Sequence, residues 1–361
     1  MRSEPKEWEW SPLPPAINVE TRVVLKKALE AQQYLSELKG ISQTIPNQGI
    51  LLNTLPIQEA RDSSEIERIV TTSDALYKAD IEKEKRIDQA TKEVQRYAIA
   101  LKEGFSRILD ERLLRVNDII AIQRTLEDND AGIRSLPGTK LSNPATGEIV
   151  FVPPQHKEVI LKALDNLVQY INDDEISNVH PLIKMAIIHV QFESIHPFYD
   201  GNGRTGRIMN ILYLVQKGLL DIPVLYLSRY IVRNKPKYYE LLQRVRTHND
   251  WESWILYMLE SVKQTSIGTI EDIRQISEEM LYAKHQIRRQ FSFYSQDLIN
   301  HIFSHPYTKI NYLKGDLRIS RPTSTKYLDE LAEAGFLEKV KQGRDNYYIN
   351  RKLLDILIDT R

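Results

Sequence analysis

Two strongly apolar stretches, residues 182–195 and 208–214, flank a short loop that is rich in glycine and arginine. Both stretches have helical periodicity and are apolar around most of the helix, which is typical of helices that are buried on all sides. The loop ends where the second helix begins, so the N-terminus of that helix faces whatever the loop encloses. The chain is therefore predicted to build a mainly helical body around these two helices.

The loop and the first turn after it, the 196–207 segment, have the sequence His-Pro-Phe-Tyr-Asp-Gly-Asn-Gly-Arg-Thr-Gly-Arg. Its three glycines let the backbone approach a ligand closely, and the helix N-terminus adds unpaired N–H groups and a positive dipole end. Arg204 and Arg207 provide cationic forks that suit phosphate oxygens. Asp200 is a candidate ligand for a divalent cation that bridges phosphates. The segment therefore predicts a polyphosphate site.

A candidate general base stands at the start of this segment. Pro197 biases His196 away from helical geometry, and a neutral imidazole there could take a proton from a hydroxyl that attacks phosphorus. His189, Glu193 and His196 could alternatively face one metal ion from a helix. We favour the general base, because Pro197 disturbs the helix end and no fourth ligand stands nearby.

Composition excludes several classes of protein. Lys+Arg and Asp+Glu both number 49, so no global charge draws the chain to nucleic acid or membrane. The absence of cysteine excludes a disulfide framework, a thiolate zinc site and a cysteine nucleophile. No apolar run approaches the roughly 18 residues of a membrane helix, and the N-terminus lacks the apolar core of a secretory signal. We expect a soluble, cytoplasmic protein.

A chain of 361 residues suggests two or three domains. Turn residues between strand formers predict an isolated β-hairpin over 133–154, resting on the helical body. Three short helices and a two-stranded ribbon near the C-terminus predict the winged variant of the helix-turn-helix. The expected divisions are a helical N-terminal region (1–95), a helical core (96–262), a connecting helix (263–290) and the winged-helix domain (291–361).

The N-terminal region contains several local signals. Clustered prolines before residue 16 predict an extended arm that lies on the body. Pro46 and Pro56 are expected to bound short segments, and a helix is expected over about 61–72. The charged run 82–86 is predicted to be a solvated helix face.

The 196–207 segment resembles the signature of the Fic (Fic/DOC) family, HPFx[D/E]GNGRxxR, at every specified position. The resemblance covers roughly residues 60–260, and the 133–154 hairpin falls where the family has its flap. It implies a helical core and the Mg²⁺-dependent transfer of AMP from ATP to a protein hydroxyl of Ser, Thr or Tyr. A flap can hold the backbone of the target by strand addition.

The resemblance also implies a role for each matching position. His196 is the general base, Phe198 anchors the loop, and Asp200 is the Mg²⁺ ligand. Residues 201–204 cradle the α- and β-phosphates, Arg207 binds the γ-phosphate, and Tyr238 contacts adenine or ribose. The implied ATP-binding residues are Glu67, His196, Gly201, Asn202, Gly203, Arg204, Thr205, Gly206, Arg207 and Tyr238.

Many members of the family carry an inhibitory helix with the pattern [Ser/Thr]-x-x-x-Glu-[Gly/Asn]. Ser63 and Glu67 fit this pattern, whereas Arg68 stands where the family has Gly or Asn. A Glu67–Arg207 pair would remove the partner of the γ-phosphate and let ATP settle in an unproductive pose. The alternative is that Glu67 caps or pairs on an exposed helix face.

Three functions follow as hypotheses. The first is a protein adenylyltransferase that is autoinhibited by Glu67. The second is removal of AMP, with Glu67 orienting a water molecule. The third is a nucleotide-sensing DNA-binding regulator, because residues 305–352 hold ten Lys/Arg against six Asp/Glu. ATP, a protein substrate and the chain itself are the expected partners. A protein contact through the wing and an intracellular homodimer are compatible with the resemblance.

Overall fold

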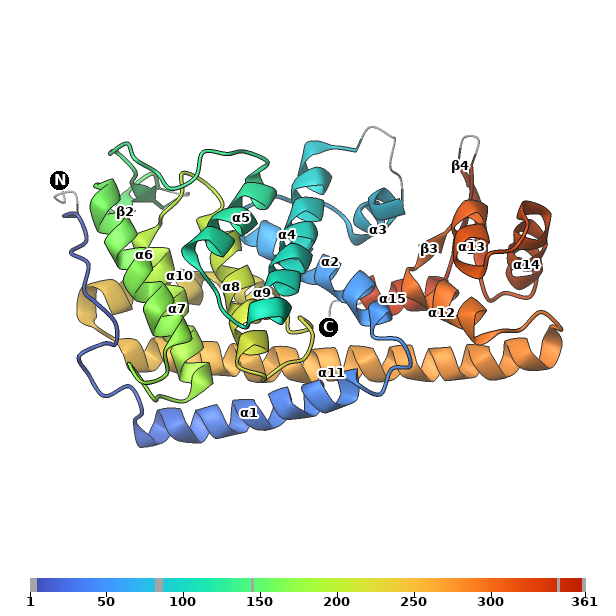
Figure 1. Cartoon of the computed structure of the whole chain (residues 1–361), viewed down its shortest axis with the longest axis horizontal. Coiled ribbons are helices and arrows are strands. Elements are labelled where there is room, and N and C mark those ends of the chain that lie inside the picture. The colour runs from blue at the N-terminus through green and yellow to red at the C-terminus, as the bar shows by residue number, and fades with distance from the viewer. Residues whose placement is uncertain (1–4, 82–86, 144–145, 343–344, 359–361) are drawn as a thin grey trace.

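A computed structural model describes residues 5–81, 87–143, 146–342 and 345–358. The molecule is elongated and mainly helical, with one long helix, α11, running beneath both a large helical body and a small C-terminal unit (Figure 1). The helices of the body are α1 (Arg22–Ser42), α2 (Gly49–Ile66), α3 (Ser73–Ile81), α4 (Gln89–Glu111), α5 (Val116–Glu127), α6 (Lys157–Asn172), α7 (Pro181–Ile195), α8 (Asn202–Gln216), α9 (Leu227–Arg233), α10 (Lys235–His248) and α11 (Trp251–Gln290). None of the described helices is both long and apolar enough to cross a membrane.

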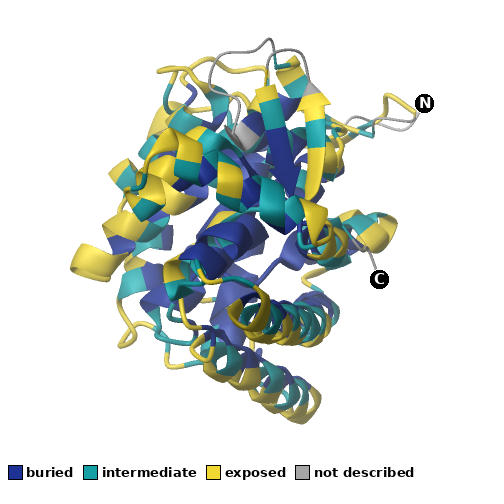
Figure 2. Cartoon of the chain, turned by 90° about the vertical axis from the view of Figure 1, so that its right-hand side faces the viewer, coloured by how far each residue is buried: buried dark blue, intermediate teal, exposed yellow. Residues whose placement is uncertain are grey.

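The two apolar stretches form α7 and α8, which lie in the centre of the body. Every residue of α7 after Pro181 is buried, and α8 is buried along almost its whole length. Figure 2 shows this buried interior in dark blue, surrounded by exposed outer faces. Pro181 occupies the first turn of α7, where its missing N–H is not needed. The predicted helical core is therefore confirmed.

Helix α2 differs from the expectation for the N-terminal region. It begins at Gly49 and ends at Ile66, rather than following Arg61 and reaching about residue 72. Pro56 lies inside it and does not bound a segment. A proline inside a helix costs about 3 kcal/mol, but all residues from Thr54 to Ala60 are buried, and tertiary packing outweighs this local penalty. The charged run 82–86 lies outside the described residues.

A short hairpin and the N-terminal arm meet on one side of the body. Strands β1 (Leu141–Ser142) and β2 (Ile149–Phe151) pair in antiparallel fashion within the predicted 133–154 flap. The arm before α1 is extended, as the prolines predict, and the Trp8 N–H donates to the Val152 carbonyl at 2.8 Å. The arm therefore lies against the end of the flap.

Helix α11 is a single helix of 40 residues. The connecting helix predicted over 263–290 is its C-terminal part, so the helix continues from the body without interruption. No proline interrupts the sequence from 251 to 290, and residues such as Val262, Ile270 and Ile273 are buried along its length. Packing against α1 over much of this length favours one continuous helix.

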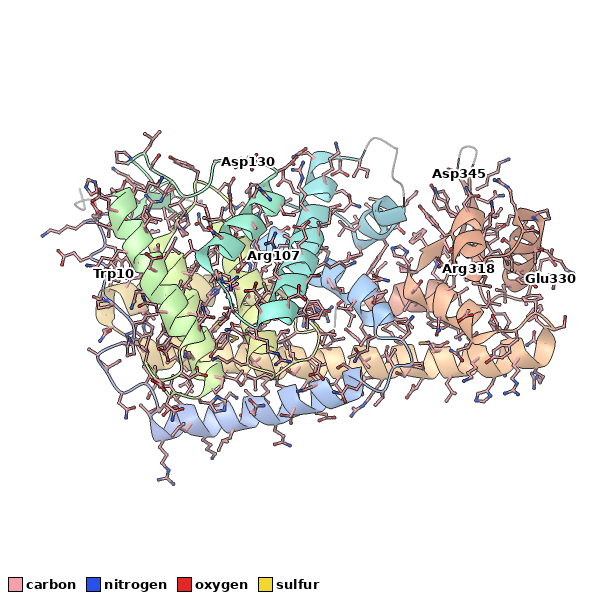
Figure 3. All side chains as sticks on the ribbon, in the orientation of Figure 1. Trp10, Arg107, Asp130, Arg318, Glu330 and Asp345 are labelled. Carbon is pink, nitrogen blue, oxygen red and sulfur yellow. The ribbon has the colours of Figure 1, made fainter. Side chains whose placement is uncertain are left out.

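The C-terminal unit contains the three predicted helices and the predicted ribbon, together with two elements that the sequence did not indicate. Strand β3 (Tyr307–Thr308) adds an edge to an antiparallel sheet in which β5 (Asp345–Ile349) lies between β3 and β4 (Glu338–Gln342). Helix α15 (Arg351–Ile358) returns to pack on α2 and α11. Labelled charged side chains of the unit, among them Glu330 and Asp345, lie on its outer surface (Figure 3). The winged-helix class of this unit stays a prediction. Its elements are α12 (Gln296–Ser304), β3 (Tyr307–Thr308), α13 (Ile310–Leu317), α14 (Arg321–Glu333), β4 (Glu338–Gln342), β5 (Asp345–Ile349) and α15 (Arg351–Ile358).

Candidate functional site

The loop between α7 and α8 is held by its own side chains. The Asn202 side chain accepts a hydrogen bond from the Phe198 N–H at 2.9 Å and donates one to the Phe198 carbonyl at 2.8 Å. Phe198 is fully buried beside Phe192. Gly201 has φ +77°, which favours glycine, and its carbonyl accepts the first hydrogen bond of α8. The loop therefore presents the N-terminus of α8 in a fixed position.

Arg207 is buried and reaches the end of α2. Its Nε donates to the Ser63 hydroxyl at 2.8 Å, and its Nη2 donates to the Ser63 carbonyl at 2.9 Å and to Glu67 Oε1 at 2.8 Å. The structure thus brings Arg207 together with Ser63 and Glu67, which lie 144 and 140 positions before it in the chain. The Glu67 carboxylate also lies against Gly203, where a Cβ atom would overlap its Oε1 atom.

Arg204 is buried beside two carboxylates, and part of its fork has no hydrogen bond to the described residues. Its Nη2 donates to Glu127 Oε1 at 2.8 Å, and Glu93 Oε2 lies 3.8 Å from Nη1. Within the described residues, its buried Nε and Nη1 atoms have no hydrogen-bond partner. Burial, opposed by the charge of Arg204, raises the pKa of Glu127. Arg204 can therefore offer two donors to an anion.

His196 ends α7 in a left-handed conformation with φ +48°. Its ring is half-buried, and among the described residues its Nδ1 atom has no hydrogen-bond partner. Burial lowers the pKa of His196 to about 3, with smaller contributions from the nearby positive charges of Arg246 and Arg134. The imidazole is therefore neutral at neutral pH and able to accept a proton.

The other predicted positions surround this loop. Asp200 is exposed, and its Oδ1 atom accepts a hydrogen bond from the Gly201 N–H at 2.7 Å. Thr205 and Gly206 are buried in α8, where a Cβ atom on Gly206 would come within 2.9 Å of Glu193. Tyr238 is buried on α10.

The hydroxyl of Tyr238 lies 2.7 Å from His189 Nε2, and the other ring nitrogen of His189 lies 2.9 Å from Asn210 Nδ2. Both nitrogens of His189 are thus used, which leaves none for a metal ion. The alternative metal site of His189, Glu193 and His196 is therefore not supported by the geometry.

Three family models match successive parts of the chain. The Fic/DOC family N-terminal model matches residues 25–106, and the Fic/DOC family model matches residues 112–214, which include the whole loop. The C-terminal domain of the protein adenylyltransferase SoFic-like model matches residues 279–353. The chain belongs to the Fic/DOC family.

Curated Fic relatives match only part of the chain. The protein adenylyltransferase fic-1 of Caenorhabditis elegans is 34% identical over 65 residues, which are 18% of this chain and 13% of that protein. A probable protein adenylyltransferase of Aquifex aeolicus is 37% identical over 79 residues, 22% of this chain and 23% of that protein. The matched part thus spans less than a quarter of the length of either relative.

Solved Fic structures share the fold over a longer part of the chain. A Fic family protein from Desulfovibrio desulfuricans G20 has a TM-score of 0.60 at 20% identity, with 94% of this chain and 98% of that chain covered. A Fic domain containing signaling protein from Bacteroides thetaiotaomicron has a TM-score of 0.56 at 20% identity, with 68% and 97% covered. These likenesses establish the Fic fold.

Three further residues near the Fic loop were not singled out by the sequence analysis. Glu127 contacts Arg204, and both the buried Arg134 and the half-buried Arg246 contact the last turn of α7. No local pattern marks them, because each belongs to a different element and meets the loop only in the folded chain. Helical spacing alone could have placed Arg246 on α10, but not its partner.

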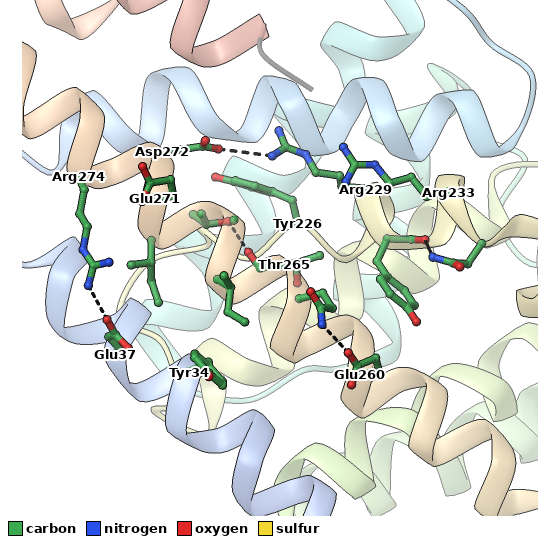
Figure 4. Close-up of a pocket in the computed structure, with 17 residues that line it drawn as sticks. Tyr34, Glu37, Tyr226, Arg229, Arg233, Glu260, Thr265, Glu271, Asp272 and Arg274 are labelled. Atoms are coloured by element: carbon green, nitrogen blue, oxygen red, sulfur yellow. Dashed lines mark hydrogen bonds and ion pairs between the residues drawn. The ribbon is translucent and has the colours of Figure 1, made fainter. Parts of the chain in front are cut away.

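A groove of about 700 Å³ lies elsewhere on this Fic protein, between α1, α9 and α11 (Figure 4). Its charged side chains largely pair with one another. Arg229 contacts Asp272 at 3.4 Å, and Arg274 donates to Glu37 at 2.7 Å. The residues of the 196–207 segment do not line this groove, so it is separate from the candidate site.

Proposed function

We propose that this chain transfers AMP from ATP to a side-chain hydroxyl of a protein, and that Glu67 restrains the reaction. The observation that carries the proposal is the combination of a neutral His196 with a glycine-rich helix N-terminus and a buried, partly unpaired Arg204. The adenylyltransferase names of the relatives support the same chemistry.

The α- and β-phosphates of ATP would bind at the start of α8. Two buried donors of Arg204 have no hydrogen-bond partner among the described residues, and each such donor costs about 1–3 kcal/mol. Phosphate oxygens would satisfy both donors and would also face the positive end of the helix dipole. Gly201 and Gly203 let the phosphates approach the backbone closely.

Asp200 is suited to hold Mg²⁺ together with these phosphates. Its carboxylate is exposed at the N-terminus of α8, and hard cations prefer oxygen ligands. When bound, Mg²⁺ would neutralise charge that develops on the phosphates. Asp200 contributes a fixed carboxylate because its Oδ1 atom is held by the Gly201 N–H.

His196 would act as the general base. It takes the proton from the hydroxyl of a Ser, Thr or Tyr residue, and the hydroxyl oxygen forms a bond to the α-phosphorus. The bond from the α-phosphorus to the oxygen that bridges the α- and β-phosphates breaks, and pyrophosphate leaves with that oxygen. Arg204 is placed to stabilise the negative charge on the phosphates.

Glu67 would restrain this reaction through Arg207. The arginine is 1% exposed and already bonded to both Ser63 and Glu67, so a γ-phosphate would have to compete for it. Breaking a buried charge pair by removing one partner costs about 3–5 kcal/mol. Without Arg207, the γ-phosphate of ATP lacks its fixed partner, and the α-phosphorus is misaligned for attack.

Intact-mass analysis with ATP and Mg²⁺ tests the proposal. We expect a gain of one AMP in the Glu67→Gly variant and none in the parent chain. In the doubly substituted chain, His196→Ala should abolish this gain while ATP binding remains. If ATP labelled at the α-phosphate gives no labelled protein with Glu67→Gly, either on itself or in a cell extract, the transferase proposal is wrong.

Removal of AMP is a second candidate, favoured by one observation. The Glu67 side chain is 35% exposed while it lies against Gly203, so its carboxylate can face a water molecule at the same site. Release of AMP from a modified protein by the parent chain, but not by the Glu67→Gln variant, would support it. Equal release by both would exclude this role of Glu67.

A further inference from the structure

The last turn of α7 leaves carbonyl groups that no later helical residue can satisfy, as every helix C-terminus does. Two arginines from other elements take them, the buried Arg134 and the half-buried Arg246. Arg134 Nε donates to the His196 carbonyl at 2.7 Å, and Arg134 Nη2 reaches the Ile195 carbonyl at 3.4 Å. Arg246 Nη2 donates to the Glu193 carbonyl at 2.9 Å. The turn that carries His196 is therefore held by two guanidinium groups.

Arg134 also joins both ends of the 133–154 flap. It stands at the start of the flap, and its Nη2 donates to the carbonyl of Pro154 at the other end. Its backbone N–H donates to the Pro197 carbonyl at 2.9 Å. The side chain is fully buried. One residue thus connects the base of the flap with the residue that follows His196.

Arg246 holds strand β2 of the flap. Its guanidinium lies 3.8 Å from the ring centroid of Phe151 in β2, a distance typical of stacking between a cation and an aromatic ring. One turn earlier on α10, Gln243 Nε2 donates to the Val150 carbonyl at 3.0 Å. The flap strand therefore rests on α10 through the same arginine that contacts α7.

In the part of the chain that the structure describes, neither arginine lies within ion-pair distance of a carboxylate, although the charge of Glu193 acts on Arg246. A cation that is shielded from water without such a pair is costly, and the negative end of the α7 dipole offsets part of this cost. An apolar side chain would fill either space without the desolvation of a charge. What the guanidinium adds is several hydrogen bonds in one fixed plane.

We propose that Arg134 and Arg246 are positioning residues that fasten the flap to the last turn of α7. A protein strand bound by the flap then presents its hydroxyl at a constant position relative to His196. This inference rests on the proposed transferase function, in which His196 is the base. It adds to that function the way in which the bound target is placed relative to the base: two arginines join the flap, which binds the target, to the turn that carries His196.

The charges around His196 agree with this role. Burial lowers the pKa of His196 most, the charges of Arg246 and Arg134 lower it further, and the backbone hydrogen bond with Glu193 raises it. Glu193, on α7, is itself buried, which raises its own pKa to about 7, and the charges of Arg207 and Glu67 also reach it. The two arginine charges thus add to the effect of burial, and both favour the neutral imidazole.

Hydrogen exchange of the full-length chain tests the fastening. Arg246→Lys keeps the charge but loses the planar fork, and Phe151→Leu removes the ring that the fork stacks on. Both should raise exchange in residues 146–154 by about tenfold while α8 is unchanged. Lys184→Met, at the other end of α7, is the matched control, because Lys184 is a buried cation that contacts Asp174 instead of the flap.

The titration of His196, followed by NMR, separates charge from geometry. Arg246→Met should raise the pKa of His196, whereas Arg246→Lys and Phe151→Leu should leave it near its parent value. A role in stability alone would not produce this split. Unchanged flap exchange in Arg246→Lys and Phe151→Leu, with no change of the His196 pKa in Arg246→Met, would overturn the proposal.

Transfer completes the test in the Glu67→Gly background. Arg246→Lys and Phe151→Leu should slow self-modification roughly tenfold with the Kd for ATP unchanged, because the hydroxyl is misplaced while the phosphate site is intact. If Glu67→Gly itself transfers no AMP, the proposed function fails. The exchange and titration results still decide whether the arginines fasten the flap.

Discussion

Glu127 connects the segment that leads to the flap with Arg204 of the candidate site. It is the last residue of α5 and contacts one nitrogen of Arg204, while the other two nitrogens of the fork have no hydrogen-bond partner among the described residues. Arg207 differs, because Ser63 and Glu67 already occupy its Nε and Nη2 atoms. Glu127 therefore leaves two nitrogens of Arg204 without a hydrogen bond, whereas Ser63 and Glu67 bond two of the three nitrogens of Arg207.

Replacing Glu127 by Gln should weaken ATP binding by about tenfold, because the Arg204 fork loses the charged partner that fixes its plane. Isothermal titration calorimetry with ATP and Mg²⁺ measures this change. Glu103→Gln is the matched control. Glu103 lies on α4 and accepts a hydrogen bond from Thr125, which is on α5 like Glu127, but it does not contact Arg204. Tighter binding in Glu127→Gln would mean that Glu127 competes with the phosphates instead.

Arg68 is the residue at which the chain departs from the family pattern. The family has Gly or Asn after the inhibitory Glu, and both tolerate positive φ better than other residues. Arg68 adopts φ +67°, so the backbone turn is kept although the residue that suits it is not. The departure thus costs local strain and leaves the Glu67–Arg207 contact in place.

At the scale of elements, α2 links the Glu67–Arg207 contact to the rest of the body. Glu59 lies two turns before Glu67 and is fully buried. It accepts hydrogen bonds from the Ser228 hydroxyl at 2.5 Å and from the Tyr97 hydroxyl at 3.0 Å. These contacts join α2 to α9 and α4, so the position of Ser63 depends on both neighbours.

Burial raises the pKa of Glu59 to about 7, above its usual value of 4.5. The folded chain therefore holds a proton that the unfolded chain releases, and this contribution to stability is complete below about pH 4.5 and lost as pH rises through about 7. The unfolding free energy should fall by on the order of 2 kcal/mol between pH 5 and pH 8 from this group. Urea unfolding measures this free energy at each pH. Between pH 5 and pH 8 it should fall more steeply with pH in the parent than in Glu59→Gln, and an equal dependence on pH in both would contradict the assignment.

The elements that the sequence predicts well are those whose signals are local. Helices α7 and α8 are apolar on all sides, and the 196–207 segment contains its own turn residues. The start of α2 could not be predicted, because burial of Pro56 overrides a local rule. Likewise, β3 is two residues long and exists only through its pairing with β5. Arg134, Arg246 and Glu127 gain meaning only from contacts across elements.

At the scale of the whole molecule, α2, α11 and α15 join the body to the C-terminal unit. Gln58 on α2 donates to the Leu357 carbonyl on α15 at 3.1 Å, and Lys352 contacts Glu279 on α11 at 2.9 Å. Buried side chains of α11 continue into the unit as far as Ile287. The two parts therefore share packing and are expected to unfold together.

Gly268 offers a test of this coupling. It lies inside α11, and a Cβ atom there would meet no neighbour within 4 Å. Gly268→Ala should therefore stabilise the helix by about 1 kcal/mol and raise one common unfolding transition by about 2 °C. Calorimetry measures both. Two separate transitions, of which only one moves, would show that the body and the C-terminal unit unfold independently.

Helix α11 also fixes a length. Its 40 residues rise by about 60 Å, and this single rigid rod carries the helical body towards one end and the C-terminal unit at the other (Figure 1). The helix therefore sets the distance between the two parts. Under the proposed transfer, a target held at the C-terminal unit would have to extend along this helix to bring its hydroxyl to His196, so the reach of the target would matter as well as its sequence.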